Sequence, residues 1–225
     1  MSVQLSSATL EVLKNFATIN SGLMFTKGTK QRTISSTKTV FAEAILDEDL
    51  PASFGIYDLN NLLAVLTFDA ATPTLSYDDP VLKVKFRDTE VTKFRCCKPE
   101  MLVLPPNKEL DLGVCDVEFD LSSEVLSRIL KSASILASPN IVVESDGTDI
   151  TLSTFDTAND SSHQYSCTIA PGEGKKYRMV FRTENWKMLP GSYRVSLSSK
   201  GIAKFVNTAR SLTYWLALET GAKTK

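Results

Sequence analysis

The chain has few side chains that could carry acid–base or nucleophilic chemistry. His163 is its only histidine, so a catalytic triad or a histidine-based metal site would depend on that one residue. The sequence contains no GxSxG, P-loop, GxGxxG or HExxH motif. Asp78 and Asp79 precede Pro80, which is typical of a turn, and residues 47–49 predict a solvated acidic loop. A site built from carboxylates alone stays open, but nothing favours one, so we expect no enzyme, no metal and no cofactor.

The four cysteines predict neither a zinc site nor a disulfide framework. Cys96, Cys97, Cys115 and Cys167 lack the closely spaced pairs that tetrahedral zinc needs. The N-terminal segment has no basic region followed by an apolar core, as a signal peptide would. No apolar run approaches the roughly 18–20 residues of a membrane span. We therefore expect four free thiols, a reducing cytoplasmic location (that of the host cell for a viral protein) and no membrane partner.

The composition indicates a folded chain. Hydrophobic residues make up 43% and charged residues 23% of the 225 residues, which excludes a wholly disordered protein. The 25 Lys+Arg against 26 Asp+Glu give a net charge of −1, which excludes a strongly basic nucleic-acid tail. A basic surface balanced by an acidic one elsewhere stays compatible with this charge. The length allows one large domain or two of about 110 residues each.

Periodicity predicts two helices in the first half of the chain. Ser6 or Ser7 caps the first, which runs to about Asn20 and carries Lys14 on the face opposite its apolar residues. Asp58 caps the second, whose apolar stripe is Leu59, Leu62, Leu63 and Leu66. Strands are expected at residues 22–26, 29–35, 39–46, 75–78, 81–88 and 91–97.

The second half repeats this order of elements. Ser122 or Ser123 caps a long helix that presents Arg128 and Lys131 on one face, and Thr183 caps a shorter helix over residues 184–189. The apolar face of the long helix is Leu126, Ile129, Leu130 and Ala133. Strands are expected at residues 112–120, 141–145, 148–155, 163–169, 177–182, 193–199, 202–208 and 211–219. The same order of elements is therefore predicted for each half: a helix, a group of strands, a shorter helix and a second group of strands.

A proline-rich segment separates the halves. The expected domains are residues 1–97 and 110–225, with residues 98–109 as a connector. Pro99, Pro105 and Pro106 argue against a helix there and favour an extended chain. The apolar run 101–104 is unusual for a linker, so it either packs back on its own domain or borders a partner site.

Several segments closely resemble the sliding clamp of T-even-type bacteriophages, the processivity factor of the replicative DNA polymerase. They are LKNFATINSGLM (13–24), IYDLNNLLAVL (56–66), PPNK (105–108), WKMLPGSYRVSL (186–197), AKF (203–205) and WLALE (215–219). The segments are spread along nearly the whole chain and follow the family's order, whereas the strands between them diverge.

The resemblance implies an α+β DNA-clamp fold with two similar domains of helices packed on antiparallel sheets. It also implies a homotrimeric ring that encircles double-stranded DNA without sequence preference. In such clamps an ATP-dependent clamp loader opens the ring, the ring tethers the replicative DNA polymerase, and transcription factors are further candidate partners. A clamp of this kind catalyses nothing.

The resemblance also assigns DNA-facing residues. Lys14, Lys131 and Lys187 match basic positions of the family, and Arg128 is added because it shares the helix face of Lys131. Lysine and arginine facing phosphates would attract DNA without reading its sequence. An acidic exterior would complement such a basic bore.

Two further surfaces follow by analogy with the family. The subunit interface pairs the strand containing Val91, Lys93 and Arg95 with the strand of the next subunit containing His163, Tyr165 and Cys167. Partners would dock in an apolar pocket whose residues are Leu102, Val103, Leu104 and Pro105 of the connector and Leu218 of the last strand. On that last strand Leu212, Tyr214 and Leu216 are expected to fill the core.

The main alternative is a non-catalytic, β-rich structural protein such as a virion or scaffold component. It would share the many strands and the lack of catalytic motifs. It would not require basic residues on helix faces or an apolar connector between domains.

Overall fold

The structure is a computed structural model. It describes residues 2–87, 89–108, 110, 112–113, 115–159 and 161–219, together with the backbone of 223–224. The chain divides into two compact units, Met1–Lys108 and Glu109–Lys225. Glu109, the predicted end of the connector, lies outside the described residues.

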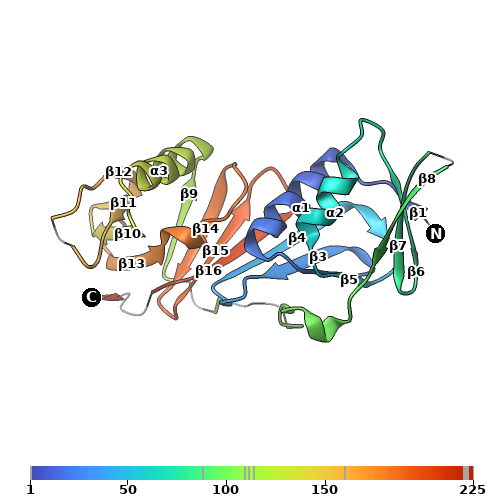
Figure 1. Ribbon diagram of the computed structural model, residues 1–225. Helices are drawn as coiled ribbons and strands as arrows, with labels where there is room; N and C mark the ends of the chain where they lie inside the picture. Colours follow the sequence, from blue (N-terminus) through green and yellow to red (C-terminus); the bar gives the residue numbers. More distant parts are fainter. Residues whose placement is uncertain are drawn as a thin grey trace. The chain divides into compact units, whose positions relative to one another are not determined.

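Two helices cover the first unit. Helix α1 (Ser7–Ile19) begins after Ser6, whose hydroxyl accepts a hydrogen bond from the Thr9 amide at 3.1 Å. Helix α2 (Leu59–Leu66) begins after Asp58, whose carboxylate accepts from the Asn61 amide at 3.0 Å. Both predicted caps are confirmed, and the two helices pack side by side (Figure 1). The predicted leucine stripe of α2 is buried throughout.

The strands of the first unit form antiparallel groups. Strands β1 (Ser2–Val3), β6 (Thr74–Asp78), β7 (Val81–Arg87) and β8 (Glu90–Arg95) make one sheet in that order, with β8 at an edge. Strand β3 (Gly28–Ile34) pairs with β4 (Val40–Leu50), and β2 (Leu23–Phe25) pairs with β5 (Phe54–Ile56). The core between these strands and the helices contains Leu13, Phe16, Leu59 and Leu62.

The predicted acidic loop at residues 47–49 is wrong. Strand β4 continues through it to Leu50, because Leu46 and Leu50 are buried on the side that faces the core. Glu48 is needed at the start of α1, where its carboxylate accepts from the Ser6 amide and the Thr9 hydroxyl, each at 2.5 Å.

The second unit has one long helix and two groups of antiparallel strands. Helix α3 (Ser123–Ile135) begins after Ser122, as predicted. One group runs in the order β12 (Ser166–Pro171), β11 (Asp149–Phe155), β10 (Asn140–Asp146), β13 (Lys176–Arg182), β17 (Lys223–Thr224). The other runs β16 (Leu212–Ala217), β15 (Ile202–Asn207), β14 (Tyr193–Ser198), β9 (Val117–Leu121). Figure 1 shows α3 lying against β11 and its neighbours.

The predicted short helix at residues 184–189 is wrong. The chain makes only a 3₁₀ turn, η2 (Thr183–Asn185), and Thr183 does not cap it. Trp186, Met188 and Leu189 are then buried in an irregular segment, where the Trp186 ring meets Phe181 and Phe205 at 5.4 Å between centroids. The Leu189 amide donates to the Tyr214 hydroxyl, and its carbonyl accepts from the Tyr193 hydroxyl. Aromatic packing therefore outweighs the local helical pattern.

Two strand boundaries and the conformation of the connector also differ from the prediction. The strand expected at 112–120 begins only at Val117, and Val114 lies outside the described residues. The strand expected at 163–169 begins at Ser166. The connector contains a 3₁₀ turn, η1 (Pro99–Met101), since proline is tolerated at the first position of a turn.

Candidate functional site

The exposed face of α1 carries one unpaired cation. Lys14 is exposed, and its helix neighbours Leu13 and Phe16 are fully buried, so the lysine projects away from the core. Within the described part of the chain, Lys14 lies in no ion pair. Helix α2 adds no charge, because its exposed residues Asn60, Asn61 and Ala64 are neutral.

The exposed face of α3 carries two cations in different settings. Arg128 contacts the carboxylate of Glu124, one turn earlier. A hydrogen bond with Tyr165 and the nearby Glu124 carboxylate raise the pKa of Arg128. Lys131 is exposed and, among the described residues, has no ion-pair partner. Lys14 and Lys131 lie in corresponding turns of two 13-residue helices, eight and nine residues after the serine caps Ser6 and Ser122.

Lys187 does not lie on a helix as predicted. It is half-buried and lies between the buried residues Trp186 and Met188, in the irregular segment after η2. The structure therefore places the four predicted DNA-facing residues on two helices and one irregular segment.

The arginines of the strands contrast with the helix lysines. All of them except Arg95 form an ion pair with a carboxylate: Arg32 with Glu43, Arg87 with Asp69 and Glu90, Arg178 with Glu144, Arg182 with Glu219, and Arg194 with Glu118. The positive charge of these paired arginines is largely compensated within the chain. The uncompensated lysines of the helices are available to an external anion.

The predicted interface residues lie at sheet edges. Val91, Lys93 and Arg95 alternate along β8, which has a neighbour, β7, on one side only. Cys167 lies on the edge strand β12, whose neighbour is β11. His163 and Tyr165 precede β12, although the Tyr165 carbonyl still accepts from the Thr154 amide at 2.8 Å.

The predicted docking residues of the connector differ from one another. Val103 is 40% and Leu104 43% exposed, and Met101 is 60% exposed. Leu102 and Pro105 are half-buried. In the second unit Leu218 is half-buried and its amide donates to the Gly201 carbonyl at 2.9 Å, whereas Leu212, Tyr214 and Leu216 are buried as predicted.

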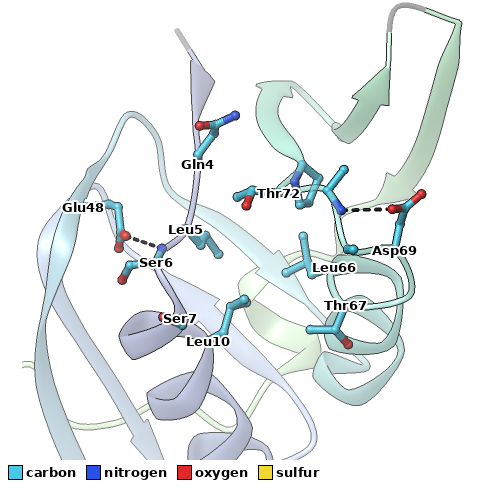
Figure 2. A pocket seen from close by; sticks show the side chains of 13 residues that line it. Gln4, Leu5, Ser6, Ser7, Leu10, Glu48, Leu66, Thr67, Asp69 and Thr72 are labelled. Atoms are coloured by element: carbon cyan, nitrogen blue, oxygen red, sulfur yellow. Dashed lines mark hydrogen bonds between the residues drawn. The ribbon is translucent and has the colours of Figure 1, made fainter.

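A pocket of about 530 Å³ lies in the first unit between the N-terminal segment and the loop after α2 (Figure 2). Its walls include the apolar side chains of Leu5, Leu10 and Leu66. Burial of Glu48 opposes its ionisation, but the hydrogen bonds from Thr9 and Ser6 outweigh burial and hold the pKa of Glu48 below its usual value. Since both carboxylate oxygens are already bonded, Glu48 supports the helix.

The described residues contain no group of three His, Cys, Asp or Glu side chains placed to hold a metal ion. The four cysteines are free thiols, and burial raises the pKa of Cys96, Cys97 and Cys167. In the part of the chain that the structure describes, no helix is long and apolar enough to cross a membrane.

The structure adds residues that the sequence reasoning missed. At Gly22 and Gly55 the backbone comes close to the side chain of Leu102 in the connector. A glycine within a short predicted strand is a signal for such an approach. Glu48 gave no signal, because its partners Ser6 and Thr9 are far from it in sequence.

Comparisons with known proteins agree with this fold. A family described as "DNA polymerase processivity factor" matches residues 6–74, and one described as "gp45 sliding clamp, C terminal" matches residues 118–220. The sliding clamp of Vibrio phage KVP40 is 30% identical over 225 residues, covering 96% of this chain and 99% of the relative. The sliding clamp of Enterobacteria phage T4 is 30% identical over 226 residues, covering 96% of this chain and 97% of the relative.

Solved clamps share the fold at low identity. The PCNA of A. fulgidus, seen with the C-terminal region of FEN-1 bound, matches with a TM-score of 0.70 and 14% identity over 99% of both chains. The DNA polymerase III subunit beta from Pseudomonas aeruginosa matches with a TM-score of 0.69 and 12% identity, over 98% of this chain and 64% of that one. The fold is thus the two-domain clamp fold, and the chain belongs to the family of phage sliding clamps, the processivity factors of DNA polymerases.

Proposed function

We propose that three copies of this chain form a ring whose basic helix faces surround duplex DNA. The observation that carries the proposal is that Lys14 and Lys131 are exposed on α1 and α3 and, among the described residues, lie in no ion pair. Lysines that meet phosphates attract any duplex and leave it free to slide. Arg128 and Lys187 belong to the same proposed surface, and Arg128 would exchange Glu124 for a phosphate.

Ring closure is assigned to the two sheet edges. Strand β8 of one subunit would pair with β12 of the next, since each offers unpaired backbone groups on one side. Such a contact joins two different surfaces, so it forms a closed ring when the rotation between subunits fits. Val91, Lys93 and Arg95 would meet His163, Tyr165 and Cys167 there.

Polymerase docking is assigned to the connector. Val103 and Leu104 offer exposed apolar side chains next to Pro105, and such a patch fits a short peptide with one or two apolar anchors. Each buried anchor would contribute about 1.5–3 kcal/mol, which gives an exchangeable contact. The clamp loader would use the same patch before the polymerase does, and Leu218 remains a further predicted docking residue. A PCNA of the same fold is seen with the C-terminal region of its partner bound.

The remaining expectations belong to the same proposal. The chain would act in the host cytoplasm and would catalyse nothing itself, as is general for sliding clamps. Transcription factors remain candidate partners.

The test is synthesis on a long primed template by the cognate polymerase. The clamp and its loader together, with ATP, should lengthen the products of a single binding event, whereas either one alone should not. Products of equal length with and without the clamp would instead favour a structural protein.

A further inference from the structure

The connector is held against the first unit by one side chain of its apolar run. Leu102 is half-buried, whereas Met101, Val103 and Leu104 are exposed. The Leu102 amide donates to the Pro99 carbonyl at 3.0 Å, which closes the η1 turn.

Two glycines make room for Leu102. A Cβ on Gly22 would lie 2.7 Å from Cδ2 of Leu102, and a Cβ on Gly55 would lie 3.2 Å from its Cδ1. Real Cβ atoms essentially never come as near as the first of these distances. The methyl groups of Leu102 therefore fill a slot beside Gly22 and Gly55, and at Gly55 a Cβ would also meet the Cys97 carbonyl oxygen at 2.6 Å.

Hydrogen bonds also hold the chain against the first unit before and after Leu102. The Cys97 amide donates to the Gly55 carbonyl at 2.9 Å, before the turn. After the turn, the Asn20 side-chain amide lies 3.5 Å from the Val103 carbonyl and also donates to the Ile34 carbonyl at 2.9 Å. The backbone is thus fixed on each side of the leucine.

We propose that Leu102 is a positioning residue, which occupies the slot at Gly22 and Gly55 and so presents Val103 and Leu104 to the polymerase peptide. This inference rests on the proposed docking surface. It separates the connector into an anchor that faces the protein and a patch that faces the partner. If Leu102 left the slot part of the time, the apparent affinity for the peptide would fall in proportion to the fraction of molecules with Leu102 in the slot.

The test is a double-mutant cycle with Gly22→Ala and Leu102→Ala, with affinity for a synthetic peptide of the polymerase C-terminus measured by calorimetry. Gly22→Ala is suitable because the other neighbours of the new Cβ, the carbonyl oxygens of Tyr57 and Ile56, lie at 3.4 and 3.6 Å, so only Leu102 must move. Each single variant should bind the peptide about tenfold more weakly, as expected when about one-tenth of the connectors are correctly placed. The double variant should bind no more weakly than Leu102→Ala, because both changes remove the Leu102 side chain from the same slot.

Two further measurements separate the possible failures. Amide exchange at Met101 and Leu102 should become faster in Gly22→Ala and Leu102→Ala, and it should stay unchanged in Ser21→Ala, a matched change at the exposed neighbouring residue. Unchanged peptide affinity in Gly22→Ala would overturn the positioning role alone. Unchanged affinity in Val103→Ser with Leu104→Ser would overturn the docking surface itself, and the role of Leu102 with it.

Discussion

At the scale of single residues, Lys14 and Lys131 share a setting that most strand arginines lack. Both are exposed on a 13-residue helix whose opposite face is buried, and neither lies in an ion pair within the described residues. The sequence alone could indicate their helix face from periodicity. It could not show which cations are already paired, because partners such as Arg194 and Glu118 lie on strands that are far apart in sequence and adjacent only in the folded sheet.

Replacing Lys14 and Lys131 by Ala should shorten the lifetime of the loaded clamp on DNA. The slope of its salt dependence should fall by roughly one unit for each phosphate that no longer meets a lysine. The control is Lys83→Ala, because Lys83 on β7 is paired with Asp78 at 2.9 Å. Lifetimes measured over a salt series on circular DNA decide the point, and equal slopes for the parent and the double variant would contradict the assignment.

At the scale of elements, helix α1 depends on a strand that is distant in sequence. Glu48 of β4 accepts from Ser6 and Thr9, so it completes the helix start that Ser6 alone would cap. The pKa of Glu48 is lowered in the folded state, so ionised Glu48 stabilises the fold above its unfolded pKa. That contribution is lost as the pH falls through the folded pKa.

Glu48→Gln should therefore lower the free energy of unfolding at neutral pH by about 2 kcal/mol, the range of hydrogen bonds to a charged group. The difference between variant and parent should shrink as the solution is made acidic. Urea unfolding followed by circular dichroism at several pH values measures this, and a difference that is constant with pH would rule out the role of the charge.

The segment after η2 depends on packing in the second unit. Trp186→Ala should cost about 3–5 kcal/mol, because the ring is buried against Phe181 and Phe205. Replacing the nearby Glu184 by Ala should change stability by less than about 1 kcal/mol, because its ion pair with Arg182 lies at the surface. Urea unfolding compares the two, and a similar small loss for both variants would show that the aromatic cluster does not hold this segment.

The elements divide into those that local sequence determines and those that packing determines. The starts of α1, α2 and α3 could be predicted, since each cap bonds to an amide three residues away. The conformation of residues 184–189 could not be predicted, because it depends on the packing of Trp186 against Phe181 of β13 and Phe205 of β15. The strand through residues 47–49 could not be predicted either. Its acidic residues are typical of a loop, and only the folded chain brings Glu48 to the start of α1.

For the candidate site, the helix lysines could be predicted. Gly22 in the short predicted strand 22–26 indicates a close approach, but its partner Leu102 could not be predicted, because the two are far apart in sequence.

At the scale of the whole molecule, each unit packs helix against antiparallel strands, although the second unit has a 3₁₀ turn where the sequence predicts a shorter helix, and the edge strands β8 and β12 are the proposed contacts between subunits. Sedimentation over a concentration series should show three protomers of 24.8 kDa each in equilibrium with smaller species. Replacing Lys93 on β8 by Pro should favour the smaller species, because the Lys93 amide points away from β7, so the proline removes a donor of the open edge. A strictly monomeric parent at high concentration would exclude the ring.

The central claim is that the assembled protein surrounds DNA rather than gripping it. The most direct measurement loads the clamp on nicked circular DNA with its loader and ATP and follows the retained protein after the salt is raised. The account predicts that the protein stays on the circle at high salt and leaves within moments of linearisation, because it slides off the free ends. Equal retention on circular and linear DNA, or loss from both as the salt rises, would contradict it.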